Sequence, residues 1–138
     1  MTNNQKNNLP GLIILLFCVI GGIIGITRRE KLKEAHTIGI VTITDFSIGG
    51  RGNAGGVWLD YILNLRGNNY KGASRYSSEQ LNGEKLTSCL VGKKFPAVYI
   101  SSNPSISELL ITPNDFSKYG YNFPDSLKWI LKYIKNDY

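Results

Sequence analysis

Residues 57–76 read VWLDYILNLRGNNYKGASRY, and this stretch determines the expected fold. In Val57–Leu65 every odd-numbered residue is apolar or aromatic, as in a strand that buries one face. Arg66-Gly67-Asn68-Asn69 is typical of a tight turn, because Gly-Asn tolerates the positive φ of a two-residue hairpin. Tyr70–Tyr76 then returns as the partner strand. The stretch predicts an antiparallel β-hairpin.

Further strands are expected on both sides of this hairpin. Thr37–Phe46 is rich in β-branched residues and predicts a strand before it. Phe95–Ile100 and Glu108–Ile111 predict two more strands after it, separated by a turn at Asn103-Pro104, while Ser77–Thr87 is expected to be irregular. The sequence therefore predicts a mainly β (α+β) domain, a small antiparallel β-sandwich or barrel-like sheet of about five strands.

Two helices are expected at the C-terminal end. Thr112-Pro113-Asn114-Asp115 matches a helix cap with proline in the first turn, and Gly120 is a plausible stop. A second, amphipathic helix should start at Phe123-Pro124-Asp125. Its apolar stripe, at i, i+3, i+4 and i+7, consists of Leu127, Ile130, Leu131 and Ile134. This C-terminal helix is expected to lie on the sheet.

The N-terminal part predicts a membrane anchor. No charged residue occurs from Asn7 to Thr27, and the nineteen residues Leu9–Thr27 would extend roughly 28 Å as a helix, close to the hydrocarbon thickness of a bilayer. The segment lacks the pair of small residues that signal peptidase needs before a cleavage site, which argues against a cleaved signal peptide. Phe17 before Cys18 argues against a lipoprotein signal. An uncleaved transmembrane helix in contact with the lipid bilayer is the favoured interpretation.

The expected organisation has four parts. They are a short polar N-terminus (1–8), the transmembrane helix (9–27), a basic juxtamembrane connector (28–36) and a soluble β-rich domain with the C-terminal helix (37–138). The two cysteines, Cys18 and Cys89, fall in different parts and are not expected to form a disulfide. Gly21 and Gly25 form a G-x-x-x-G pair, which allows weak helix dimerisation, although glycine is common in membrane helices.

The distribution of charge bears on sidedness and on partners. The chain has a net charge of +6, but 11 basic and 8 acidic residues after His36 leave only +3 in the soluble part, so no nucleic acid partner is expected. Four basic residues follow the predicted span and one precedes it. The positive-inside rule therefore places the soluble domain on the cytoplasmic side.

Several short motifs resemble those of a known group of proteins. Gly67-x-x-Tyr70-x-Gly72, then Gly92-x-x-x-Pro96-x-Val98-Tyr99 and Asn103-Pro104, resemble a broad family of bacterial membrane-anchored small β-domain proteins of unknown function. The resemblance covers about residues 37–112 and implies a single-pass protein of the bacterial inner membrane. The family often has Tyr-Asp-Pro before its Asn-Pro, whereas this chain has Tyr99-Ile100-Ser101-Ser102, and the C-terminal helix is extra. The family implies no activity.

Residues suited to catalysis or metal binding are sparse. His36 is the single histidine and lies next to the predicted span, and Cys89 has no base near it in the sequence. The acidic residues Asp45, Asp60, Glu79 and Glu84 lack the spacing of a calcium loop, and a conventional zinc site cannot be assembled. We therefore expect no catalytic residues, no cofactor and no metal site.

The glycine-rich stretch 49–56 is the candidate partner-binding loop. A phosphate cradle needs a helix after the glycines, but a strand is expected there. A flexible connection between strands is the simpler interpretation; the sharper one is a binding loop in which Arg51 meets an acidic partner. The candidate residues of this loop are Gly49, Gly50, Arg51, Gly52 and Asn53.

These observations support two classes of function. The first is a membrane-tethered accessory or protein-interaction module that binds a protein partner through a sheet edge or the glycine loop. The second is a small-ligand-binding or enzymatic domain whose site has no sequence signature. Lys71 and Arg75 with nearby tyrosines could also suggest nucleic-acid binding, but outward charges are usual on a half-buried strand.

Overall fold

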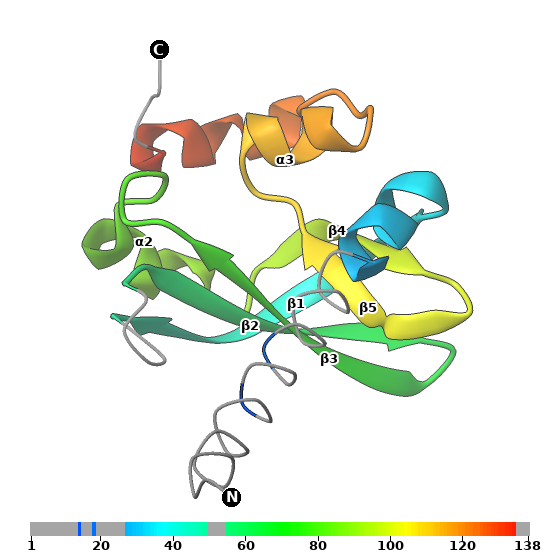
Figure 1. The fold of residues 1–138 in the computed structure, drawn as a ribbon. Helices are drawn as coiled ribbons and strands as arrows, with labels where there is room; N and C mark the ends of the chain where they lie inside the picture. The colour runs from blue at the N-terminus through cyan, green and yellow to red at the C-terminus, as the bar shows by residue number, and fades with distance from the viewer. Residues whose placement is uncertain (1–13, 15–17, 19–26, 50–54, 135–138) are drawn as a thin grey trace, which may run out of the picture.

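A computed structural model of the chain describes residues 14, 18, 27–49 and 55–134. Five strands dominate it: β1 (Thr37–Ile48), β2 (Val57–Leu65), β3 (Asn68–Tyr76), β4 (Lys94–Ile100) and β5 (Asn103–Leu109). They form a single antiparallel sheet in the order β3-β2-β1-β4-β5 (Figure 1). The predicted mainly β fold of about five strands is confirmed.

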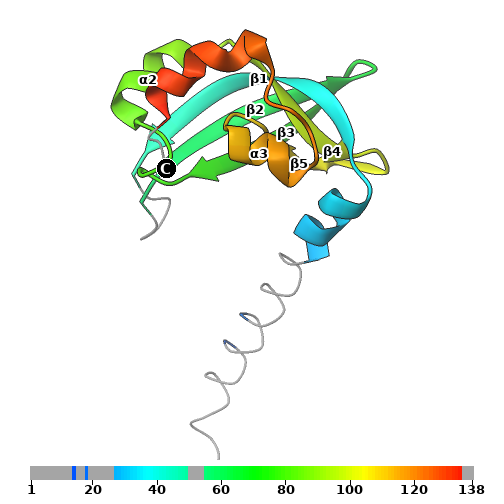
Figure 2. The ribbon, with the colours of Figure 1, turned by 90° about the horizontal axis from the view of Figure 1, so that it is seen from above.

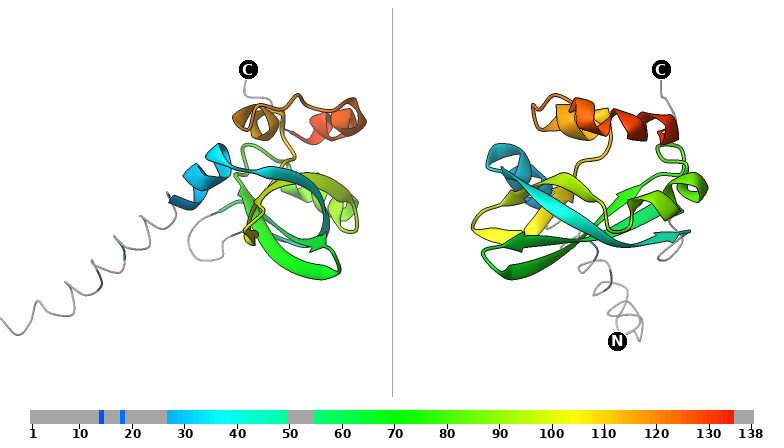
Figure 3. Two further views of the ribbon diagram at one scale, coloured as in Figure 1. Left: turned by 90° about the vertical axis from the view of Figure 1, so that its right-hand side faces the viewer. Right: turned by 180° about the vertical axis from the view of Figure 1, so that it is seen from behind.

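The long central strand β1 bends the sheet into a barrel. Its first half, Thr37–Thr42, pairs with β4, and its second half, from Val41 onward, pairs with β2. A β-bulge between Ile43 and Asp45 lies within the half that pairs with β2, and bulges increase local twist and bending. The sheet therefore curls round on itself into a nearly closed ring (Figure 3, left).

The β2–β3 hairpin is present, with its turn one residue earlier than expected. Arg66 and Gly67 have φ values of 52° and 85°, and positive φ at both central residues is the requirement of a type I′ turn. Leu65 consequently pairs with Asn68, so that both asparagines belong to β3. Arginine rather than asparagine occupies the first positive-φ position.

The barrel interior is filled by the alternating residues that the sequence indicates. Val57, Leu59, Tyr61 and Leu63 of β2 are all buried. β1 contributes Val41 and Ile43 and β4 contributes Phe95, also buried. Burial of this apolar surface is the main stabilising term for such a domain. Ile38 and Ile40, on the other face of β1, remain 44% and 57% exposed.

Three short helices follow β3 in the described part of the chain: α2 (Gly83–Leu90), α3 (Pro113–Lys118) and the 3₁₀ helix η1 (Asp125–Tyr133). α3 begins as predicted, with Pro113 in its first turn and a capping box between Thr112 and Asp115. Gly120 follows it with a φ of 77°. The prediction of an irregular Ser77–Thr87 is wrong from Gly83 onward, where α2 forms.

β5 begins five residues earlier than predicted. The sequence placed a turn at Asn103-Pro104 and a strand at Glu108–Ile111, whereas the turn lies at residues 101–102. Leu110 and Ile111 are fully buried although they follow the strand, because they lead to α3 under the helices. The Leu110 N–H still donates to the Pro96 carbonyl oxygen of β4 at 2.9 Å, and the apolar character of both residues reflects their burial.

The C-terminal helix differs from the prediction in kind. η1 is a 3₁₀ helix, which has three residues per turn, so that residues three apart share a face. Leu127 and Ile130 are buried as expected, but Leu131 is 37% exposed. The predicted four-residue stripe is thus wrong at Leu131, because it assumed α-helical spacing.

The chain before β1 packs on the barrel. Residues 27–34 are helical, and Leu32 is buried in the core with 4% of its surface exposed. His36 Nδ1 lies 2.7 Å from the Leu32 carbonyl oxygen, and the His36 ring packs on Tyr119 and Tyr121 in T-shaped geometry at centroid distances of 5.0 and 5.6 Å. Figure 2 shows this segment beside the barrel.

The predicted transmembrane helix Leu9–Thr27 falls almost wholly outside the described residues, as do Gly21 and Gly25. In residues 27–49 and 55–134, no helix combines the length and the apolar character needed to cross a bilayer.

Candidate functional site

The barrel has one discontinuity, between its two edge strands. In an antiparallel sheet, neighbouring strands alternate in direction, so the first and fifth strands run the same way. β3 and β5 are these two strands, and their backbones form no ladder with each other in the described sheet. We call the boundary between β3 and β5 the seam.

Side chains close one end of the seam. The Leu109 backbone N–H of β5 donates to Ser74 Oγ of β3 at 3.1 Å. The Tyr76 hydroxyl lies 2.9 Å from the Leu109 carbonyl oxygen, to which it donates. Both backbone groups of Leu109 are therefore satisfied by β3 side chains, and Ser74 is one of the few buried polar residues.

Asp115 reinforces this closed end from α3. Its Oδ2 atom accepts hydrogen bonds from the backbone N–H groups of Ile111 (3.0 Å) and Thr112 (2.8 Å), and lies 3.2 Å from the Tyr76 hydroxyl. Burial raises the pKa of Tyr76 well above its ordinary value, and the neighbouring Asp115 carboxylate raises it further. Tyr76 thus remains a hydrogen-bond donor at physiological pH.

Tyr61 is buried in the barrel interior next to the other end of the seam. Its hydroxyl lies 3.1 Å from Ser107 Oγ, a contact that joins β2 to β5 through the barrel interior. Its ring lies directly against Gly72 of β3, where a Cβ atom would be only 2.3 Å from the ring. A glycine at position 72 is therefore required for the Tyr61 ring to reach the seam.

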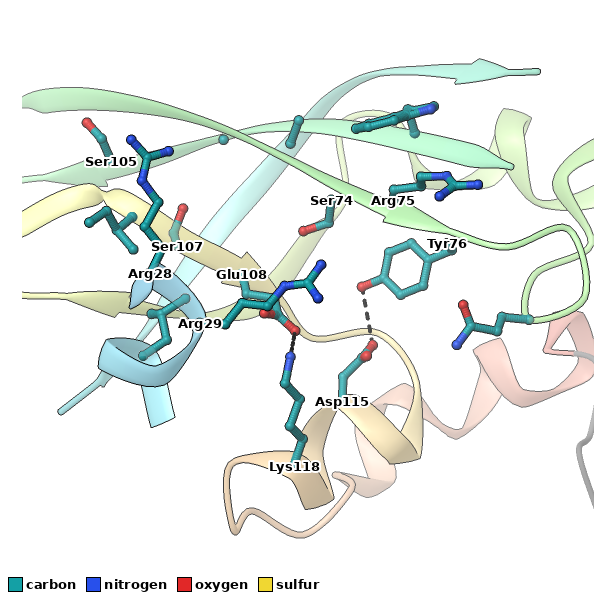
Figure 4. Close-up of a pocket in the computed structure, with 16 residues that line it drawn as sticks. Arg28, Arg29, Ser74, Arg75, Tyr76, Ser105, Ser107, Glu108, Asp115 and Lys118 are labelled. Atoms are coloured by element: carbon teal, nitrogen blue, oxygen red, sulfur yellow. Dashed lines mark hydrogen bonds and ion pairs between the residues drawn. The ribbon is translucent and has the colours of Figure 1, made fainter. Parts of the chain in front are cut away.

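Along the seam lies an open groove of about 600 Å³. Both edge strands line it, Gly72–Tyr76 on one side and Ser105–Glu108 on the other. Arg28 and Arg29 of the helical segment 27–34 also line it, together with Lys118 of α3 (Figure 4). Segments from three separate parts of the chain thus meet at the seam.

The charged side chains of the groove differ in whether they pair with other groups of the protein. Lys118 pairs with Glu108, which also accepts a hydrogen bond from the Tyr119 hydroxyl at 2.8 Å. Burial, followed by this hydrogen bond to Glu108, raises the pKa of Tyr119. Arg28 and Arg29 are exposed, and neither is paired with a carboxylate in the part of the chain that the structure describes. The two arginines are thus available to a ligand.

Backbone groups of both edges also face the seam. In a two-residue hairpin the pair next to the turn exchanges hydrogen bonds, and the pairs then alternate. Because Leu65 and Asn68 are that pair, Ala73 of β3 directs its N–H and C=O away from β2. In β5 the groups of Leu109 face β3, so those of Ser107, two residues earlier in the regular ladder, face the same way. The open end of the seam presents two strand edges.

The residues singled out in the sequence are not brought together. Within the candidate loop, Gly49 donates its N–H to Gly56 O at 3.0 Å, whereas Gly50, Arg51, Gly52 and Asn53 lie outside the described residues. Lys71 and Arg75 are exposed on β3. The expected role of this loop stays a prediction.

The two residues considered for nucleophilic chemistry have different neighbours. His36 packs on Tyr119 and Tyr121, whereas Cys89 Sγ lies 4.0 Å from the Tyr133 hydroxyl. No cluster of three or more histidine, cysteine or acidic side chains able to hold a metal ion occurs among the residues that the structure describes. Neither His36 nor Cys89 lines the groove at the seam, which is the candidate site.

Sequence analysis missed the seam, although a signal for it was present. An expected antiparallel sheet of about five strands has an odd number of strands, and such a sheet cannot close with antiparallel pairing throughout.

Comparison with known protein families, curated proteins and solved structures gives no match for this chain. The resemblance to bacterial membrane-anchored β-domains stays a prediction.

Proposed function

We propose that this protein is a membrane-tethered interaction module that binds an extended segment of a partner protein at the seam. The observation that carries the proposal is the pair of edge strands, β3 and β5, which run side by side in the same direction without pairing. A strand that runs antiparallel to both can hydrogen-bond to either edge. Addition of a peptide strand to an exposed sheet edge is a recurring mode of recognition.

The groove is better suited to a peptide than to a small molecule. Its volume of about 600 Å³ falls within the range of small-ligand sites, but such sites are enclosed and mainly apolar. This groove is open and is lined by Ser105 and Ser107, by charged side chains and by unpaired backbone edges. Backbone groups that face outward from a strand are complementary to another strand.

The proposed tether is the uncharged segment Leu9–Thr27. It leads directly into the helical residues 27–34, which are held on the barrel by Leu32. With Leu9–Thr27 in the bilayer, Arg28 and Arg29 would lie close to the headgroups, and the groove that they line would lie close to the membrane surface. We place the module at the bacterial inner membrane, on its cytoplasmic side, where it would meet membrane-associated partners.

A photo-crosslinking amino acid at Ser105, in the full-length chain in native membranes, tests the proposal. We expect a discrete adduct with one partner. Ala73→Pro should abolish this adduct, because proline removes an N–H that faces the seam while the ladder to β2 does not use it. Ala73→Ser is the matched control and should leave the adduct unchanged.

Two results would contradict the proposal. One is an adduct at Ser105 that persists in Ala73→Pro at wild-type yield, with the variant folded by circular dichroism. The other is equal crosslinking from the exposed Lys93, which lies outside the groove.

A further inference from the structure

The charges around the seam identify the chemistry of its occupant. Resting on the function proposed above, we infer that the occupant is an acidic extended segment with carboxylates at alternate positions, held by Arg28 and Arg29. Their position above a groove between two open strand edges carries the inference.

The groove has an excess of positive charge. Four cations line it, Arg28, Arg29, Arg75 and Lys118, against the carboxylates of Glu108 and Asp115. Both carboxylates are engaged within the protein: Glu108 by Lys118 and the Tyr119 hydroxyl, and Asp115 by two backbone N–H groups, with the Tyr76 hydroxyl 3.2 Å away. The positive charge that remains favours an anionic ligand.

Arg28 and Arg29 differ from Arg75, the third arginine of the groove, in the position of their side chains. Arg75 donates a hydrogen bond to the Gly55 carbonyl oxygen, which fixes its side chain on the outer side of β3. Arg28 and Arg29 extend from the helical segment 27–34 toward the seam (Figure 4). Guanidinium groups bind carboxylates through two parallel hydrogen bonds, so each of these two arginines can take one carboxylate.

The direction of side chains in a strand sets the spacing of those carboxylates. A strand placed at the seam would turn alternate side chains toward the barrel and toward the helical segment. Toward the barrel lie Gly72 and Ser107, which are small and leave room for small residues, and the Ser107 hydroxyl already contacts Tyr61 in the interior. Toward the helical segment lie Arg28 and Arg29. The expected pattern is therefore acidic, small, acidic.

An anionic lipid headgroup is the competing occupant, because Arg28 directly follows the predicted span. A headgroup would use the arginines but would leave the edges of β3 and β5 unpaired. A peptide satisfies both the guanidinium groups and the outward-facing backbone groups, so the peptide accounts for more of the site.

Fluorescence anisotropy with the full-length chain in an uncharged detergent tests the inference. The probes are a labelled heptapeptide of alternating threonine and glutamate, and its counterpart with glutamine in place of glutamate. We expect the glutamate peptide to bind at least about tenfold more tightly. The double variant Arg28→Gln/Arg29→Gln should weaken its binding about tenfold, with stronger binding at low salt in the wild type.

Lys93→Gln/Lys94→Gln removes two exposed charges outside the groove and should leave peptide binding unchanged. Equal affinity for the two peptides, or no binding of either, would overturn the inference; the Ser105 adduct would still decide the proposed function separately. Binding of short-chain phosphatidylglycerol that depends on Arg28 and Arg29, without peptide binding, would assign the arginines to lipid and also overturn the inference.

Discussion

Tyr76 illustrates how single residues hold the barrel closed. From β3, its hydroxyl reaches both the Leu109 carbonyl oxygen of β5 and the Asp115 carboxylate of α3. The residue is 4% exposed, so its hydroxyl would be costly to bury without these partners. Ser74, two residues earlier on the same face, satisfies the Leu109 N–H. Two side chains on one strand thus replace the missing backbone ladder.

The buried tyrosines predict alkaline unfolding. Burial is the largest cause of the raised pKa of Tyr61, Tyr76 and Tyr119. The folded state therefore holds these protons more tightly than the unfolded state, whose tyrosines titrate near pH 10. Stability should be fully present below pH 10 and should fall as the pH rises above it. Absorbance at 295 nm should show that some of the 8 tyrosines ionise only on unfolding.

Tyr76→Phe separates two contributions of this hydroxyl to stability: its hydrogen bond and its raised pKa. At pH 8 it should lower the free energy of unfolding by about 1 kcal/mol, because Leu109 O loses its donor. Above pH 10 its stability should fall less steeply than that of the wild type, since one shifted group is gone. Tyr70→Phe, on the same strand, is the control. Ionisation of all tyrosines near pH 10 in a chain that stays folded would disprove the interpretation.

At the scale of elements, local sequence patterns predict the bounds of a strand correctly where the buried residues are also the residues paired in the sheet. β2 has the predicted bounds because its alternating residues face a core on one side only. The pattern fails at β5, whose first residues, Asn103-Pro104-Ser105, have low strand propensity; Asn103 pairs with Ile100 of β4, and a register shift follows. The pairing of strands is a tertiary property, and a local reading of the sequence cannot supply it.

The packing of η1 leads to a prediction at the scale of elements, which distinguishes a 3₁₀ helix from an α-helix. Ile130 is fully buried, so Ile130→Ala should lower the free energy of unfolding by about 2–5 kcal/mol. Leu131 is adjacent in sequence but 37% exposed, so Leu131→Ala should lower the free energy of unfolding by less than about 1 kcal/mol. Lys132→Ala, on the exposed surface, is the control for general effects. Chemical denaturation measures all three, and equal losses at Ile130 and Leu131 would contradict the 3₁₀ packing.

The whole molecule determines the seam, which no single stretch of sequence encodes. It requires an odd number of strands, the curvature that β1 imposes, and the return of residues 27–34 to the same edge as β3 and β5. Arg28 and Arg29 were interpreted from sequence as flanking charges of a membrane span. Their second environment, at the groove, arises only because Leu32 docks the segment on the barrel.

Membrane anchoring is the prediction that belongs to the whole chain. Val19 lies near the middle of the uncharged segment Leu9–Thr27, where a lysine costs about 2.5–3.5 kcal/mol for insertion into a bilayer. After carbonate washing, the wild-type chain should stay in the membrane pellet and Val19→Lys should be partly released. Val91→Lys introduces the same side chain at an exposed valine of the β-rich domain and should stay in the pellet. A soluble wild-type product that begins near Thr27 would show instead that the segment is removed, and Arg28 and Arg29 would then face the seam without a membrane beside them.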